Sequence, residues 1–186
     1  MKLSEICNLK GGFQGKITEG GNVFKLIKLK DVNSDGVINY DELDYFTPEK
    51  EMNDKYVLKK GDVILKAKSG DNIAAIIDGN EDNIVATSHY IILTVKDVSV
   101  LNPEYLEVYL NSEYAKEYSI RNSEGTSLSI IKLKSIEDME IKLVDLEKQK
   151  EISKVYNLMK EEKKIVEKIV KNRESQFKQY LRESLK

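Results

Sequence analysis

The sequence predicts an α+β fold, in which a mainly antiparallel sheet is followed by one long C-terminal helix. All ten glycines and both prolines of the 186-residue chain lie in its first 125 residues. Short apolar runs bounded by turn residues fill that part, whereas a helical stripe fills the remainder. We therefore expect two units, residues 1–145 and residues 146–186.

Four short runs in the first unit predict strands. Each is apolar or alternating, and each is bounded by Gly, Asn or Asp, which favour turns. The runs are FKLIKLK (24–30), DVILKAK (62–68), NIAAIID (72–78) and NIVATSHYIILTV (83–95).

Residues 101–118, LNPEYLEVYLNSEYAKEY, predict a helix. Asn102 can cap its N-terminus and Pro103 suits the first helical position. Leu106, Leu110 and Tyr114 then recur at helical spacing.

The long helix is predicted from about residue 146 to residue 185. About 38 residues at a rise of 1.5 Å would extend roughly 57 Å, more than a small domain can cover. We expect an intermolecular coiled coil, in a homodimer or on a helical partner, rather than a helix folded back on its own domain. A seven-residue repeat runs along it but is interrupted by Arg173. The residues predicted to form the dimer are Ile152, Val155, Met159, Val166, Ile169, Val170, Phe177 and Tyr180.

Charge is divided unevenly between the two units. Residues 1–145 carry 18 Lys and Arg against 25 Asp and Glu, a balance of −7, and residues 146–186 carry 12 against 7, a balance of +5. An acidic domain argues against strong unaided binding to nucleic acid, because affinity for phosphates needs cations.

Cysteine and histidine usage limits the available chemistry. The single Cys7 excludes an internal disulfide framework and a multi-cysteine zinc site, and nothing near it activates a thiol. We interpret Cys7 as a small buried residue. The start of the sequence does not resemble a secretory signal, and no apolar run reaches the length of a membrane span, so we expect a cytoplasmic protein.

The stretch DVNSDGVINYDE matches the loop of a calcium-binding EF-hand. The ligands would be Asp31, Asn33, Asp35, the carbonyl of Val37, and Glu42. However, the preceding residues predict a strand rather than a helix, no second loop is present, and Asn, Asp and Gly also favour a tight turn. We expect a turn here and keep calcium binding as the alternative.

Several segments, in this order, resemble the target recognition domain and conserved helix of Type I restriction-modification specificity subunits. The segment KLSEICNLKGGFQGK is similar to the family's first strand and glycine turn, and YVLKKGDVILKAKSG and VATSHYIIL are similar to two later strands. LNPEYLEVYLNSE is similar to its Asn-Pro-x-Tyr-Leu helix, EGTSLSIIKLKSIEDMEIKL to its last loop and strand, and LEKQKEI to the start of its spacer helix.

The resemblance implies a non-catalytic subunit that recognises double-stranded DNA and recruits methyltransferase subunits, with or without a restriction subunit. S-adenosylmethionine would be bound by the methyltransferase, and this chain would bind no cofactor. Full-length members carry two recognition domains joined by two antiparallel helices. This chain resembles half of one, which implies a homodimer reading a symmetric, interrupted site. Pairing with a full-length subunit stays open, and the rival function is a calcium-responsive protein-binding module.

Side chains that can contact DNA are predicted in four loop clusters. Base edges are read by paired donors and acceptors, and phosphates are bound by cations. Phe13 in the first cluster could stack or wedge, whereas His89 lies in an apolar run, which favours a structural role. The candidates are Lys10, Gln14 and Lys16; Lys66, Lys68, Ser69 and Asn72; Ser88, His89 and Tyr90; and Arg121, Asn122, Thr126 and Ser127.

Overall fold

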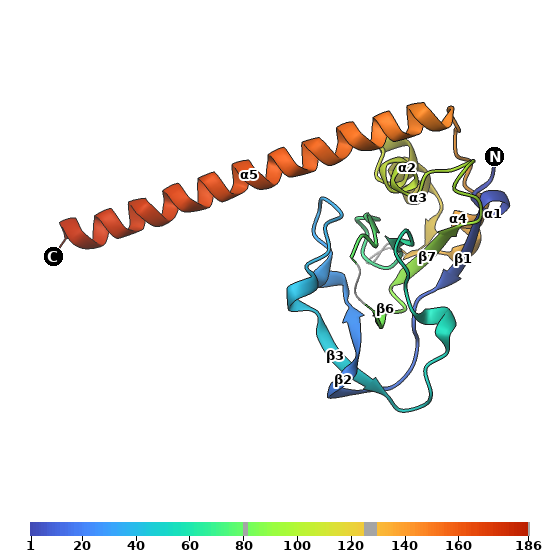
Figure 1. Cartoon of the computed structure of the whole chain (residues 1–186), viewed down its shortest axis with the longest axis horizontal. Coiled ribbons are helices and arrows are strands. Elements are labelled where there is room, and N and C mark those ends of the chain that lie inside the picture. Colours follow the sequence, from blue (N-terminus) through green and yellow to red (C-terminus); the bar gives the residue numbers. More distant parts are fainter. Residues whose placement is uncertain (80–81, 125–129, 186) are drawn as a thin grey trace.

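The computed structural model describes residues 1–79, 82–124 and 130–185 and has the predicted α+β class (Figure 1). Its central sheet has four antiparallel strands in the order β1 (Cys7–Gly11), β7 (Tyr90–Val95), β4 (Val63–Lys66) and β5 (Ala74–Ile76).

Two smaller sheets accompany the central one. In the first, β2 (Ile17–Ile27) pairs antiparallel with β3 (Asp44–Pro48) and parallel with β6 (Ile84–Ala86). In the second, β8 (Ser123–Glu124) pairs with β9 (Ile130–Ile131). The short helices are α1 (Leu3–Ile6), α2 (Pro103–Leu110), α3 (Glu113–Arg121) and α4 (Leu133–Asp138).

The middle of the central sheet, formed by β4 and most of β7, is buried on both faces. On one face Val63 and Leu65 pack into a cluster that includes residues of α1, α2 and α4. On the other face Ile64 and Ile92 pack against residues of β2, β6 and the loops between β2 and β3. Burial on both sides explains why these strands read as continuous apolar runs rather than as alternating ones.

Two predicted elements are divided in the structure. The run at 83–95 forms β6 and β7, which belong to different sheets and are joined by a turn. The predicted helix at 101–118 becomes α2 and α3, because Asn111 leaves the helix to bond the backbone of β5 and Ser112 caps α3. The predicted capping by Asn102 is confirmed, since its side chain accepts hydrogen bonds from the backbone N–H groups of Glu104 and Tyr105.

Strand boundaries also differ near the N-terminus. The run at 24–30 leaves the strand at Ile27, and residues Leu29–Asp31 form a 3-10 turn. The opening segment forms the single helical turn α1 before β1 begins. The prediction that Cys7 is buried is confirmed, and burial raises the pKa of its thiol to about 12.

The long helix is confirmed as α5 (Leu146–Ser184), and its C-terminal part projects away from the domain (Figure 1). Its first turns pack on α2. There Gln149 and Ser153 are buried, and Gln149 bonds the backbone of Val100, Asn102 and Val144. In the described part of the chain, no helix combines the length and apolar character needed to cross a membrane.

Candidate nucleic-acid interface

Three of the four predicted loop clusters meet at one end of the central sheet. In the strand register Gly11, the last residue of β1, lies opposite Ile91, and Lys66, the last residue of β4, lies opposite Tyr90. The segments that follow β1 and β4 and the turn that precedes β7 therefore emerge together. We call these segments, residues 12–16, 67–72 and 87–89, the loop end of the domain.

Backbone hydrogen bonds tie these segments to one another. The N–H of Gly12 donates to the carbonyl of Tyr90 over 2.9 Å, and the N–H of Phe13 donates to Ala86 over 2.8 Å. The N–H of Ala67 donates to the carbonyl of His89 over 2.8 Å. Such bonds hold the loops on the sheet in fixed relative positions.

Gly12 is required by this close approach. A Cβ atom at this position would lie 2.1 Å from the carbonyl oxygen of Thr87, a distance that no side chain can occupy. The neighbouring Gly11 faces open space instead. The glycine turn therefore sits against the turn between β6 and β7 because residue 12 has no side chain.

The loop end presents cations and hydrogen-bonding groups to solvent. Gln14, Lys16 and His89 are exposed, and Lys68 and Ser88 are half-buried. The exposure of His89 corrects the prediction of a structural histidine in an apolar strand: it lies in the turn, with Nδ1 3.3 Å from the hydroxyl of Thr87.

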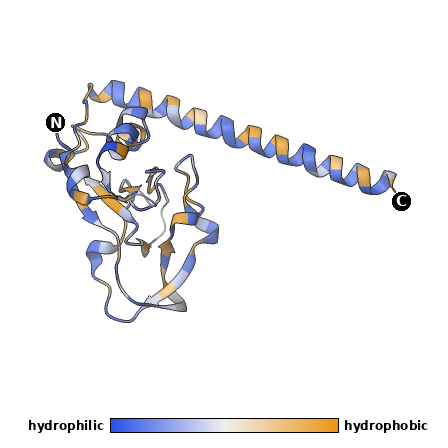
Figure 2. Cartoon of the chain, turned by 180° about the vertical axis from the view of Figure 1, so that it is seen from behind, coloured by the Kyte–Doolittle hydropathy of each residue, from blue (hydrophilic) through white to orange (hydrophobic). Residues whose placement is uncertain are grey.

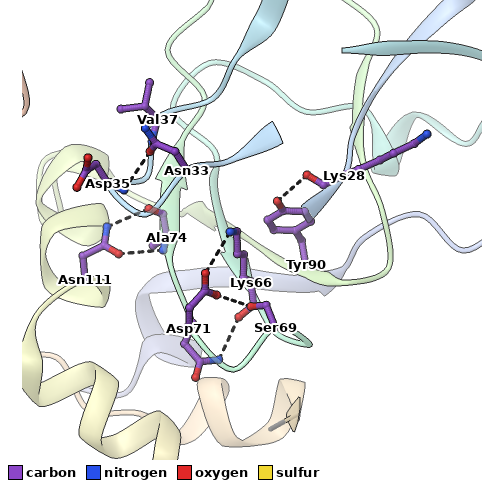
Figure 3. Close-up of polar contacts among 11 residues, drawn as sticks. Lys28, Asn33, Asp35, Val37, Lys66, Ser69, Asp71, Ala74, Tyr90 and Asn111 are labelled. Carbon is purple, nitrogen blue, oxygen red and sulfur yellow. Dashed lines mark hydrogen bonds and ion pairs between the residues drawn. The ribbon is translucent and has the colours of Figure 1, made fainter. Parts of the chain in front are cut away.

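Three predicted contact residues are instead buried and support the loops from below. Lys66 is 6% exposed and forms an ion pair of 3.2 Å with Asp71. Asn72 adopts a φ of 46° and donates to the carbonyl of Lys66. Tyr90 is 1% exposed and donates its hydroxyl proton to the carbonyl of Lys28 (Figure 3). Each of these three side chains therefore has an internal partner in the structure, and its contact with DNA stays a prediction.

Asp71 is a supporting residue that the sequence analysis missed. It accepts hydrogen bonds from Ser69 and Lys66, which keep its pKa below the usual value although partial burial acts to raise it (Figure 3). Ser69, predicted to contact DNA, is therefore engaged within the turn. The sequence Ser69-Gly70-Asp71 could have indicated this role, because an Asp in a glycine-containing turn often bonds to neighbouring groups of the turn.

The fourth predicted cluster approaches the same end through β9. The N–H of Ile131 donates to the carbonyl of Ala67 over 2.9 Å, which attaches the β8–β9 pair to the segment after β4. Arg121 is exposed at the end of α3, and the Asn122 amide donates to the carbonyl of Tyr118. Thr126 and Ser127 lie outside the described residues.

Two residues of the first cluster have different environments. Lys10 lies within β1, opposite Ile92, and is half-buried. Phe13 packs with Phe46 and Tyr56, with ring centroids 5.8 and 5.5 Å away. The ring of Phe13 is half-buried against a small core cluster that contains Phe46, and its stacking or wedging role stays a prediction.

The calcium-loop-like segment forms the predicted turn. The side-chain oxygen of Asn33 accepts from the backbone N–H groups of Asp35 and Val37 (Figure 3). Gly36 has a φ of 71°, and a Cβ there would lie 2.3 Å from the carbonyl oxygen of Ala74. A 3-10 turn precedes the segment and a second one, which contains Glu42, leads into β3.

The carboxylates of that segment also have partners within the chain. Asp31 is buried and accepts from the N–H of Lys28 over 2.7 Å, and Asp35 pairs with Lys163 of α5. Among the described residues, no three or more His, Cys, Asp or Glu side chains are grouped as a metal site would require.

The outer part of α5 carries an exposed apolar stripe (Figure 2). Ile152 differs from the other residues predicted for the dimer, because it is half-buried against the core of its own domain. The exposed members of the prediction are Val155, Met159, Val166, Ile169, Val170, Phe177 and Tyr180, and Leu158, Ile165 and Leu181 extend the stripe.

Comparison with known proteins identifies relatives of this architecture. A family model described as Type I restriction modification DNA specificity domain matches residues 1–171. No curated protein sequence matches the chain.

Two crystal structures have a similar fold. The HsdS subunit from Thermoanaerobacter tengcongensis matches with a TM-score of 0.64 and 18% identity over 89% of this chain and 43% of that one. The Type I restriction-modification S subunit from M. genitalium matches with a TM-score of 0.59 and 16% identity, over 87% and 38%. The chain thus spans about two fifths of the length of these subunits.

Proposed function

Since the chain belongs to the family of Type I restriction modification DNA specificity domains, we propose that it reads DNA sequence for a Type I restriction-modification system. The observation that carries this proposal is the convergence of the glycine turn, the β4–β5 turn and the β6–β7 turn at one end of the sheet. Loops held rigidly on a sheet are a suitable platform for base contacts.

The exposed and half-buried side chains of the loop end divide between two tasks. Gln14 and Ser88 offer hydrogen-bond donors and acceptors for base edges. Lys16 and Lys68 offer cations for phosphates, and His89 can serve either task. Arg121 and Lys10 lie at the margins and extend the contact region.

The domain does not supply the whole affinity. Residues 1–145 have a charge balance of −7, and the segment 31–54 alone holds eight acidic residues against one Lys. A methyltransferase partner that also contacts the DNA would provide the missing cations. Tight binding of the isolated chain to DNA, insensitive to salt, would contradict this division of labour.

The chain itself would act without catalysing a reaction. S-adenosylmethionine would be bound by the methyltransferase subunit, and this chain would determine where methylation occurs. A restriction subunit would be a further member of the assembly only where restriction accompanies methylation.

We infer that the exposed stripe of α5 pairs two copies of the chain. Apolar surface of this extent marks an interaction site, and a symmetric pair would present two loop ends to a bipartite, two-fold symmetric DNA site. Val166→Asp combined with Val170→Asp should leave the domain folded but monomeric in light scattering. Lys171→Asp on the opposite side of α5 is the matched control, and a dimer unchanged by the Val substitutions would show that the stripe is not the interface.

The function is tested by co-expressing the chain with the methyltransferase subunit of a Type I system and mapping methylated bases across the host genome. We expect a symmetric, interrupted motif that requires this chain. Gln14→Ala and Lys16→Ala, which remove a base-reading group and a phosphate-binding cation, should then erase or change the motif. A purified complex that adds no methylation would contradict the proposal.

A further inference from the structure

The apolar stripe of α5 is interrupted by two opposite charges on one face. Glu162 and Arg173 are both exposed. Eleven residues separate them, close to three turns of about 3.6 residues each, so they lie above one another along the helix. Val155 and Tyr180, about seven turns apart, share that face. Among the ion pairs of the described residues, neither Glu162 nor Arg173 takes part.

The residues of this face are arranged symmetrically about the point between residues 167 and 168. Reflection through that point exchanges Glu162 with Arg173 and Val155 with Tyr180. The remaining exchanges are Val166 with Ile169 and Met159 with Gln176. When a second copy of α5 runs in the opposite direction, apolar residues of this face therefore meet apolar residues and Glu162 meets Arg173. The exception is Met159, which meets Gln176.

We propose that two copies of α5 pack antiparallel in the register that sets Arg173 against the partner's Glu162, so that this charge pair selects both the direction and the register of the dimer. The inference rests on the homodimer of the proposed function and adds its geometry. Each dimer contains the charge pair twice, once on either side of the two-fold axis.

Other arrangements place these charges badly. A parallel pair in register would set Glu162 against the partner's Glu162 and Arg173 against the partner's Arg173, and like charges repel. An antiparallel pair slipped by one heptad would bury Arg173 against the partner's Val155 or the partner's Ile169, depending on the direction of the slip. An unpaired charge against an apolar residue is the usual means by which a coiled coil rejects a wrong register.

The register has a consequence for DNA recognition. Ser153 is buried where α5 docks on its domain. In the proposed pair, the two copies of Ser153 are 29 residues apart along the helices, about 44 Å. A slip of one heptad would change this distance by about 10 Å, or about three base pairs of DNA. Glu162 and Arg173 would therefore help to fix the spacer length of the recognised site.

Charge reversal tests the pairing. Glu162→Arg or Arg173→Glu alone should weaken dimerisation about tenfold in a dilution series followed by sedimentation, since two attractive contacts become repulsive. The double variant Glu162→Arg with Arg173→Glu should restore it. In a parallel dimer, the single substitutions would not weaken dimerisation in this way and the double variant would not restore it. That result would overturn the proposal.

Disulfide trapping tests the direction independently. Two differently tagged chains, one with Val155→Cys and one with Tyr180→Cys, should form a mixed disulfide when co-expressed and oxidised. The chain with Val155→Cys alone should not cross-link, because its two copies would be about 37 Å apart, and the buried Cys7 provides a low background.

The outcomes separate this inference from the proposed function. A wild-type chain that stays monomeric at every concentration contradicts the homodimer itself. A dimer that cross-links through two copies of residue 155, or that ignores charge reversal, keeps the homodimer and overturns the register.

Discussion

Replacing Lys160 with methionine removes the cation from a buried ion pair that joins α5 to the domain. Its Nζ lies 2.8 Å from Oε1 of Glu107 on α2, and the Glu107 side chain is 1% exposed while that of Lys160 is 18% exposed. Methionine retains most of the apolar stem, so the substitution tests the charge more than the packing.

The expected loss follows from the burial of Glu107. Burial raises the pKa of this carboxyl group, and Lys160 opposes that rise. Without Lys160 the carboxylate is desolvated with no compensating charge, which costs about 3–5 kcal/mol in buried pairs. A groove of about 740 Å³ between α5 and the domain is lined in part by Lys160, so the cation side of the pair is open to solvent. We therefore expect about 3 kcal/mol, at the lower end of that range.

The loss should depend on pH in a defined direction. A carboxyl group whose pKa is higher in the folded state binds its proton more tightly there. The folded state is then destabilised as pH rises from the unfolded pKa towards the folded one. Because Lys160→Met increases this difference in pKa, the deficit relative to wild type should be full at pH 8 and should shrink as pH falls towards 5.

The free energy of unfolding at each pH can be measured by denaturant titration with tyrosine fluorescence as the signal, since the chain has ten Tyr and no Trp. Lys163→Met is the matched control about one turn further along α5. Its pair with Asp35 is more exposed than the Lys160–Glu107 pair, so the substitution should have little effect. Adding Glu107→Gln to Lys160→Met should recover most of the loss by removing the buried charge. Equal stability of the two Lys variants, or a deficit that does not shrink at low pH, would refute the reasoning.

Three further outcomes are expected. Gly12→Ala should lower the midpoint of thermal unfolding and abolish DNA binding, because its Cβ would collide with the carbonyl of Thr87, whereas Gly11→Ala should change neither. In binding curves over a range of salt, Gln14→Ala should relax preference at one base by about 1–3 kcal/mol, while Lys16→Ala should weaken all sequences alike and reduce the salt dependence by about one charge. Calcium should leave the midpoint of thermal unfolding unchanged, and an increase would support the calcium-responsive alternative.

The sequence contained the pattern of elements but not the tertiary contacts that divide them. The strands β6 and β7 are both apolar and mostly buried, so neither shows an alternating pattern, and the three polar residues between them, Thr87, Ser88 and His89, are included in a single predicted strand. The break between α2 and α3 depends on Asn111 bonding both backbone groups of Ala74, 37 residues earlier in the chain. The contact between Asn111 and Ala74 cannot be identified from the local sequence around either residue.

The same dependence on tertiary contacts explains why some candidate contact residues are buried. Lys66 follows a strand and precedes a glycine-containing loop, the place where a DNA-binding Lys would be expected, yet Asp71 neutralises it beneath the loop. Tyr90 bonds the carbonyl of Lys28 in a different sheet. Residue type and position relative to a strand identify the loop end correctly, but they do not separate the side chains that face solvent from those that hold the loops.

The two regions with proposed roles are attached to opposite ends of one strand. The first residue of β7, Tyr90, joins the loop end through the N–H of Gly12, and the chain beyond its last residue, Val95, leads to Val100 and Asn102, which Gln149 of α5 binds. A six-residue strand whose first four residues are buried is a stiff connection of about 20 Å. The Glu107–Lys160 pair also helps to fix the direction of α5 relative to the domain. A change in the register of two α5 helices would therefore move the two loop ends as rigid units and would not be absorbed by a flexible joint. Loss of the Lys160 contact should accordingly loosen the preferred DNA spacer length while the sequence of each half-site stays the same, which methylation mapping of the Lys160→Met variant can measure.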